Sequence, residues 1–400
     1  MNNSLYPSLC QINTRVRLNS LSRQIGRPAT LDDIPDSELD ELANLGFDWI
    51  YCLSVRQTGA AGRKDSRSNP QWFAEYRELL PDLQEDDICG SGFAITAYVP
   101  GIRLGDEDAL IRLCDRLRDS GLKLMLDFVP NHTAPDHPWV KAYPEYYVSG
   151  TEEQLAGQPQ NYIKLDLPQG PSIQAYGRDP YFDGWPDTLQ LNYGNPDLQV
   201  AQTEELLKIS RCCDGLRCDM AMLVLPAIFE RTWDIAAEPF WPMAIYKARE
   251  EHPDFVFMAE VYWDLEWTLQ QQGFDYIYDK RLYDRLREKH ALPVWGYFRA
   301  DLEYQKKSAR FLENHDELRA ATAFPSQVHE VAVILTYFCP GLRFFHEGQL
   351  QGWQKKISVH LFRGLEQPSD QDLHAFYRRL LETIRHKYFH KNGDIRDAER

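Results

Sequence analysis

The chain has 400 residues, of which 43% are hydrophobic, so it is long enough to bury one large core or two ordinary ones. A formal net charge of −16 excludes the basic footprint that nucleic acids and anionic membranes require, and it favours a neutral substrate. No run of 18 apolar residues is present, so we predict no membrane span and no membrane partner.

Two further features of composition concern location and ligand. The N-terminus has no basic segment leading into an apolar one, and the eight cysteines form no CxxC pair, so we expect reduced thiols in a cytoplasmic protein. Aromatic residues reach 12%, with 10 Trp and 21 Tyr, which suits a flat polar ligand that stacks on rings. Ordinary core packing is the alternative for most of these rings.

Strands alternate with helices along most of the chain. The predicted strands are 8–16, 47–55, 122–131, 213–221, 255–263, 274–278, 310–313 and 342–345. The predicted helices are 32–45, 106–120, 198–210, 227–236, 241–251, 280–289, 328–338 and 372–386. A polar loop with Arg23, Arg27 and Pro28 follows the first strand, and 59–87 is a long loop with one short helical stretch near 72–80.

This alternation predicts an α/β fold, a (β/α)8 TIM barrel with parallel strands. The segment 132–196 is rich in Pro, Gly, Tyr and Asp and has little periodicity, so we expect an irregular insertion after the third strand. The predicted division is therefore a catalytic barrel from 1–131 and 197–390, an inserted small domain over the active site at 132–196, and a tail at 391–400.

Polar residues cluster where the predicted strands end. In such a barrel all the loops that follow strands converge on one face, where functional residues gather. The third, fourth, fifth and seventh strands end in Asp127, Asn131 and His132, in Arg217 and Asp219, in Glu260, and in Asn314, His315 and Asp316.

Two of these carboxyl groups have contrasting surroundings. Arg217 and Asp219 are two residues apart on one strand and so share a side, and a neighbouring guanidinium keeps a carboxylate ionised, as a nucleophile requires. Glu260 precedes Val261, Tyr262 and Trp263, whose bulk would exclude water and favour the protonated form that a general acid needs. The alternative for Glu260 is a structural ion pair with an arginine. A carboxyl pair of this kind on neighbouring strands is what retaining glycoside cleavage requires.

Four short segments carry a family resemblance. They are DFVPNH at 127–132, GLRCD at 215–219, AEVYW at 259–263 and FLENHD at 311–316, with DTLQLN at 187–192 as a weaker fifth. In this order, and at the ends of strands, they make the chain similar to the α-amylase family of retaining glycoside hydrolases.

The resemblance implies a role for each matching residue. Asp219 would be the nucleophile, Glu260 the acid and base, and Asp316 the carboxylate that binds sugar hydroxyls. His132 and His315 would donate hydrogen bonds to the same sugar, and Arg217 would orient Asp219. Asp127 would support Arg217. Capping of a loop is the alternative for the histidines, and a buried partner without substrate contact is the alternative for Asp127.

The chain also departs from the family pattern. A Gly-Tyr pair whose ring stacks on the sugar is replaced by Gly92 and Phe93, and the usual Lys-His after the nucleophile is replaced by Met220, Ala221 and Met222. Asn131 therefore lacks its usual calcium partner, and the DxNxDG-type calcium loop is missing, so we expect no metal and no cofactor. The C-terminal β-sandwich of the family is apparently absent.

The predicted activity is hydrolysis of α-glucosidic bonds in oligosaccharides or small α-glucosides by double displacement. The alternatives are an α-glucan transglycosylase or sugar phosphorylase of the same family, and a non-catalytic barrel module. Within the insertion, Trp185 lies between Gly184 and Pro186, so it is the predicted contact for distant sugars. Tyr181 and Phe182 are further candidates, whereas Tyr146 and Tyr147 are expected in the insertion's own core.

Overall fold

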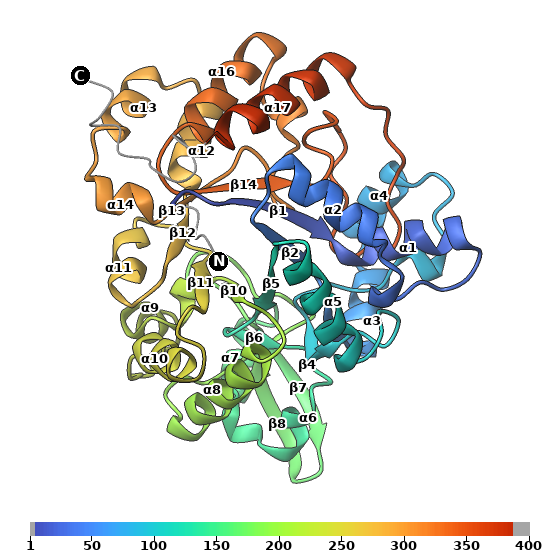
Figure 1. Cartoon of the computed structure of the whole chain (residues 1–400). Helices are drawn as coiled ribbons and strands as arrows, with labels where there is room; N and C mark the ends of the chain where they lie inside the picture. Colours follow the sequence, from blue (N-terminus) through green and yellow to red (C-terminus); the bar gives the residue numbers. More distant parts are fainter. Residues whose placement is uncertain (1–4, 387–400) are drawn as a thin grey trace.

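A closed barrel of eight parallel strands forms the centre of the computed structural model, which describes residues 5–386 (Figure 1). In chain order the strands are β1 (Ser8–Asn13), β2 (Trp49–Leu53), β5 (Lys123–Phe128), β10 (Gly215–Cys218), β11 (Val256–Ala259), β12 (Tyr276–Tyr278), β13 (Ser308–Arg310) and β14 (Leu342–His346). Each strand pairs with the next, and β14 pairs with β1 to close the ring. The (β/α)8 barrel and all eight of its strands are confirmed.

Burial explains why these segments form strands. All five residues of β2, Trp49–Leu53, are buried, because a barrel strand faces side chains inside the ring and helices outside it. Six of the eight strands end two to four residues earlier than predicted. The polar residues that follow them lie at the mouth of the barrel, where their side chains are available for other contacts.

Helices cover the outside of the barrel (Figure 1). They are α1 (Thr14–Ile25), α2 (Asp36–Leu45), α5 (Glu107–Asp119), α8 (Pro196–Ser210), α9 (Pro226–Trp233), α10 (Trp241–Glu251), α11 (Glu266–Gln271), α12 (Lys280–Arg287), α16 (Ser326–Tyr337) and α17 (Gln371–Ile384). The helix α5 shows the pattern: Asp106 caps its first turn by accepting from the amide of Ala109, and Leu110, Leu113 and Leu117 are buried against the strands.

The prediction for the first thirty residues is wrong beyond Asn13. The strand was expected to reach residue 16 and to be followed by a polar loop, but α1 begins at Thr14. Asn13 accepts a hydrogen bond from the amide of Val16, and Leu18 and Leu21 are buried at helical spacing. Gly26, with a φ of 73°, ends the helix. These cap and spacing signals are present in the sequence.

The long loop predicted at 59–87 is also partly wrong, because it contains two helices. These are α3 (Ala60–Ser68) and α4 (Pro70–Leu79). Six shorter helices and turns lie between the barrel strands: α13 (Ala291–Tyr297), α14 (Leu302–Lys306), α15 (Ala320–Ala323), and the 3-10 turns η1 (Leu31–Asp33), η2 (Glu85–Asp87) and η4 (Ala221–Val224). A two-stranded ribbon of β3 (Arg56–Thr58) and β4 (Ile95–Pro100) flanks the loop that carries Phe93.

The segment 132–196 is more regular than predicted. It contains β6 (His132–Thr133), α6 (Pro138–Ala142), η3 (Pro144–Tyr146), α7 (Glu152–Gly157), β7 (Tyr162–Leu167), β8 (Gly170–Ala175) and β9 (Leu189–Gln190). The β7–β8 hairpin projects at the lower edge of Figure 1. Val148, Ile173 and Leu191 belong to the same hydrophobic cluster as the barrel strands, so the insertion shares the core of the barrel.

Three predictions concern the chain as a whole. All eight cysteines are free thiols, as expected, and none is exposed. Among residues 5–386 the only sheets are the barrel and three two-stranded ribbons, so this range contains no β-sandwich. None of the helices in the described range is long and apolar enough to cross a membrane. The tail predicted at 391–400 lies outside the described residues.

Candidate active site

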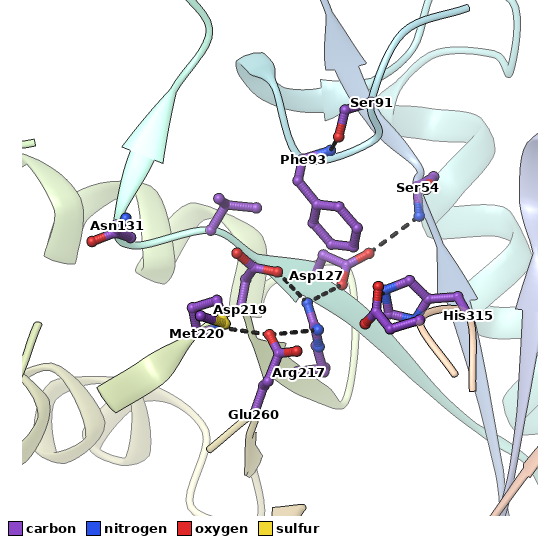
Figure 2. A network of polar contacts seen from close by, with 12 residues as sticks. Ser54, Ser91, Phe93, Asp127, Asn131, Arg217, Asp219, Met220, Glu260 and His315 are labelled. Atoms are coloured by element: carbon purple, nitrogen blue, oxygen red, sulfur yellow. Dashed lines mark hydrogen bonds and ion pairs between the residues drawn. The ribbon is translucent and has the colours of Figure 1, made fainter. Parts of the chain in front are cut away.

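The strand ends bring Asp127, Arg217, Asp219, Glu260 and His315 together at the mouth of the barrel (Figure 2). Arg217 lies at the centre of this group, and its side chain is almost wholly buried. One terminal nitrogen, Nη1, lies 2.6 Å from Oδ1 of Asp219 and 3.6 Å from Oδ1 of Asp127. The other, Nη2, lies 2.7 Å from Oε2 of Glu260. One cation therefore holds three buried carboxyl groups.

Strand register fixes the relation between the two predicted catalytic carboxyls. Cys218 of β10 pairs with Ala259 of β11, so Asp219 and Glu260 occupy the next pair of positions on adjacent strands. The backbone amide of Glu260 donates to the carbonyl of Cys218 at 3.0 Å, which continues the ladder. Neighbouring strands are about 4.8 Å apart, so the two carboxyl groups are placed side by side.

The direction expected for the pKa of Asp219 is wrong. Arg217 does act to lower it, but burial has the larger effect, and together with the charge of Glu260 it raises the pKa of Asp219 to about 8. The desolvation comes from residues on distant strands, which the sequence pattern does not reveal. Near neutral pH the protonated form of Asp219 is therefore favoured in this structure, because ionisation would place its charge in a buried site beside a second carboxyl group.

Glu260 is held from several sides at once. It is buried, as expected, and it also forms the ion pair with an arginine that was the alternative. The amide of Met220 donates to Oε2 at 2.7 Å, and the hydroxyl of Tyr262 donates to Oε1 at 2.9 Å. Met220 has a left-handed backbone, with a φ of 42°. This strained conformation occurs directly after Asp219, at the residue whose amide donates to Glu260.

Phe93 covers the other side of Arg217. Its ring stacks on His315 with 5.3 Å between ring centres, and the Arg217 guanidinium lies 5.2 Å from the ring centre. Gly92 precedes it, and a Cβ at this position would collide with the side chain of Ser54. Glycine is therefore required for the close approach that brings Phe93 to the site.

His315 and Asp316 follow β13 after a short irregular stretch. Nδ1 of His315 is hydrogen bonded to Nε2 of Gln11 at 2.9 Å, and Nε2 of His315 lies 3.1 Å from Oδ2 of Asp316. Burial holds the pKa of His315 well below its usual range, so the ring is neutral. The side chain of Asp316 is 46% exposed, whereas that of Asp219 is 7% exposed. Of the three predicted catalytic carboxyl groups, Asp219, Glu260 and Asp316, the last is therefore the most open to a ligand.

His132, Asn131 and Trp185 form a second group on the side of the insertion. Oδ1 of Asn131 accepts from Nε2 of Gln190 at 3.0 Å, and the His132 ring packs edge-on against Trp185 with 5.3 Å between centres. Burial lowers the pKa of His132 to about 3. Within residues 5–386 no hydrogen bond or ion pair joins this group to Asp219, Glu260 or Asp316.

Of the two tyrosines expected in the core of the insertion, Tyr147 is buried and Tyr146 is half-buried. Tyr147 is 1% exposed and its hydroxyl bonds to Thr133 at 2.8 Å, whereas Tyr181 and Phe182 are 55% and 71% exposed. Trp185 is half-buried. Across residues 5–386 no three His, Cys, Asp or Glu side chains gather as a metal site would require.

Several residues of the site were missed in the sequence. Tyr51 donates to Asp127, Tyr278 accepts from Nε of Arg217, and Gln11 and Tyr262 have the contacts given above. Tyr262 was detectable, because it lies two residues after Glu260 and such residues share a side on an extended chain. The other three lie on β2, β12 and β1, in positions whose spacing carries no comparable signal.

The family model named "Alpha amylase, catalytic domain" matches residues 92–262, which include Phe93, Asp127, Arg217, Asp219 and Glu260. This part of the chain is similar to the α-amylase family. An α-amylase structure from Lactobacillus plantarum shares the fold of this chain, with a TM-score of 0.67 and 21% identity, covering 95% of this chain and 79% of that one.

Two curated proteins that are similar in sequence to this chain have different activities in their names. An α-1,4-glucan:maltose-1-phosphate maltosyltransferase from Burkholderia pseudomallei is 25% identical over 300 residues, which are 70% of this chain and 22% of that protein. Alpha-amylase 3 from Dictyoglomus thermophilum is 24% identical over 294 residues, which are 66% of this chain and 54% of that protein. The chain thus spans about half or less of the length of these relatives.

Proposed function

We propose that the protein is a retaining glycoside hydrolase that cleaves α-glucosidic bonds in oligosaccharides or small α-glucosides. The observation that carries this proposal is the register of β10 and β11, which places Asp219 and Glu260 side by side on adjacent strands. Retaining enzymes need their two carboxyl groups only about 5 to 5.5 Å apart, whereas inverting enzymes leave room for a water between them. Neighbouring positions on a parallel ladder favour the shorter separation.

The double displacement assigns one role to each carboxyl group. Asp219 attacks the anomeric carbon and forms a glycosyl ester, while Glu260 gives its proton to the departing glycosidic oxygen. Glu260, now ionised, takes a proton from water, and that water breaks the ester and restores Asp219. The cycle needs an ionised Asp219, whereas burial in the cluster of three carboxyls and one guanidinium raises the pKa of Asp219 to about 8, so Asp219 must lose its proton before it attacks.

The other residues of the site bind the sugar or orient the two reacting carboxyl groups. The partly exposed carboxylate of Asp316 can accept hydrogen bonds from sugar hydroxyls, and the ring of Phe93 offers a stacking face without a hydroxyl. Arg217 holds both reacting carboxyls through separate nitrogens, so it positions them without contacting the sugar itself. A non-catalytic barrel would not need three carboxyl groups gathered on one cation.

A second candidate is transfer of the glycosyl group to a sugar hydroxyl or to phosphate. It is favoured by the similarity to the maltosyltransferase, which covers 70% of the chain. Both reactions pass through the same glycosyl ester, and they differ in what attacks it. The four sequence segments at the site are therefore compatible with either.

Product analysis separates these activities. The protein would be incubated with maltooligosaccharides, sucrose and glucosylglycerol, each with and without phosphate, and the products would be resolved by chromatography and their anomers by NMR. Hydrolysis with retention predicts free sugar that first appears as the α-anomer. Longer oligosaccharides would indicate transfer, sugar phosphates formed only with phosphate would indicate a phosphorylase, and β-anomers would contradict the double displacement.

A further inference from the structure

A cavity of about 280 Å³ lies beside the barrel mouth, separate from the proposed catalytic carboxyl groups. It is enclosed by the start of α1, by β3 and α3, by the turn after β4, and by Phe362. None of Asp219, Glu260 and Asp316 lines it. The volume is close to the lower limit of small-molecule sites, which is about 300 Å³, so the cavity suits a small ligand.

The cavity is strongly basic. Arg15, Arg63, Arg67 and Arg103 all line it, and Asp86 is the one carboxylate among the lining residues. The chain as a whole has a net charge of −16, so this local excess of positive charge runs against the composition. A concave site lined by charge of one sign attracts an oppositely charged ligand more strongly than a flat surface does.

Two of the four arginines have structural tasks. Arg15 donates to the carbonyls of Ser54 and Gly90 at 3.0 and 2.9 Å, so it ties α1 to the neighbouring loops. Arg67 forms an ion pair with Glu85 at 2.6 Å. These two arginines contribute positive charge to the cavity, but most of their N–H groups already donate to acceptors in the protein.

The other two arginines, Arg63 and Arg103, are available to bind a ligand. Among the described residues neither Arg63 nor Arg103 forms an ion pair or hydrogen bond with a carboxylate. Nε of Arg63 is buried without a hydrogen-bond partner, and so is Nε of Arg67. A buried donor left without an acceptor costs free energy, and this cost is relieved when a ligand supplies the acceptor. Arg103 is exposed and lies over the ring of Phe362, with its guanidinium 5.4 Å from the ring centre.

We propose that this cavity binds the phosphate group of a small phosphorylated ligand. The guanidinium fork matches the geometry of a phosphate, and arginines on several walls suit a group with three equivalent oxygens. Ile88 and Phe362 line the same space and can pack against the non-phosphate part of the ligand.

The bound ligand would touch the loop that supplies Phe93 to the active site. Cys89 lines the cavity, and Gly90, which accepts from Arg15, is three residues before Phe93. The proposal concerns binding, and it stands whether the active site performs hydrolysis or transfer. The connection through this loop gives activity assays a second readout.

The test is calorimetric titration of the full chain with inorganic phosphate, glucose 1-phosphate and glucose. We expect saturable binding of both phosphates and none of glucose at this cavity. Arg63→Gln and Arg103→Gln should each weaken phosphate binding about tenfold or more, because each loses a charge-assisted hydrogen bond. Arg299→Gln is the matched control, since Arg299 also stacks on an aromatic ring, that of Trp295 at 4.9 Å, but lies elsewhere.

Phosphate bound at the active site would give a different pattern. It would bind equally to Arg63→Gln and Arg103→Gln and would be displaced by saturating maltotriose, whereas binding in this cavity would persist with maltotriose present. Arg103 is exposed, so its substitution should leave the fold intact, which circular dichroism would check. Absence of saturable binding, or equal affinity in the wild type and both variants, would overturn the proposal.

Discussion

Tyr262 donates a hydrogen bond of 2.9 Å from its hydroxyl to Oε1 of Glu260, while Arg217 and the Met220 amide occupy Oε2. Both oxygens of the proposed acid are therefore oriented by fixed neighbours. This arrangement is typical of a group whose geometry must be reproducible when a bond is broken.

Removing that hydroxyl should slow catalysis while leaving binding largely unchanged. For Tyr262→Phe we expect kcat to fall about tenfold with KM little affected, because one orienting hydrogen bond of roughly 1 to 1.5 kcal/mol is lost. The control is Tyr246→Phe, which removes a similar 2.8 Å bond to Glu250 on the exposed face of α10. Steady-state kinetics check both variants. An unchanged kcat for Tyr262→Phe would show that Glu260 needs no such support.

The two reacting carboxyls should each be indispensable. Asp219→Asn cannot form the glycosyl ester and Glu260→Gln cannot donate a proton, so each variant should lose nearly all activity while staying folded. Asp214→Asn is the control, because Asp214 lies at the opposite end of β10 and pairs with Arg118 at 2.9 Å. Activity above roughly a tenth of the wild-type rate in either site variant would contradict the assignment.

Chelation should leave the protein active. No metal-binding group of side chains is found within residues 5–386, and the carbonyl oxygen of the Asn131 side chain already accepts from Gln190. We therefore expect activity and Tm to survive dialysis against EDTA. Assay and thermal melt before and after dialysis, with calcium or magnesium added back, measure this. A large drop in Tm that calcium restores would reveal a calcium site.

Trp185 should matter most for long substrates. It is half-buried against His132 in the insertion, and we expect it to contact sugars beyond the point of cleavage. Binding energy from remote sugars helps only chains that reach them, so Trp185→Ala should lower kcat/KM more for long maltooligosaccharides than for short ones. Trp267→Ala, at a 57% exposed position on α11, is the control. Equal losses at every chain length, or an unfolded variant, would assign Trp185 to the core.

Asp187 should make stability depend on pH. Burial raises the pKa of this carboxyl from 3.8 to about 7, so between these values the folded protein binds a proton that the unfolded chain releases. Its contribution to folding is thus complete below pH 3.8 and is lost as the pH rises to about 7. The effect is at most about 1.4 kcal/mol for each pKa unit.

The matching variant is Asp187→Asn, which keeps the shape of the side chain and cannot ionise. Urea unfolding between pH 4 and 8 should show a smaller loss of stability with rising pH for this variant than for the wild type. Asp183→Asn, four residues earlier and exposed, should follow the wild type. Parallel curves for Asp187→Asn and the wild type would show that Asp187 is ionised in the folded protein.

From the sequence alone it was possible to predict the barrel architecture and the gathering of Asp127, Asp219 and Glu260 near Arg217. Apolar runs that end in polar residues identify barrel strands, and the two-residue spacing of Arg217 and Asp219 correctly predicts a shared side. The protonation of Asp219 could not be predicted, because it depends on how completely residues from other strands exclude water. The partner of His315 was equally hidden, since Gln11 is 304 residues away in the chain.

The pairing of β14 with β1 has a consequence for how the chain folds during synthesis. The first strand gains its second neighbour only after residues 342–346 have left the ribosome, so an unfinished barrel presents two open edges for most of translation. Open parallel edges are prone to pair with other chains. A stop codon shortly before Leu342 would leave these edges permanently uncovered, and such a product would be expected to aggregate even though Asp219, Glu260 and Asp316 were all present.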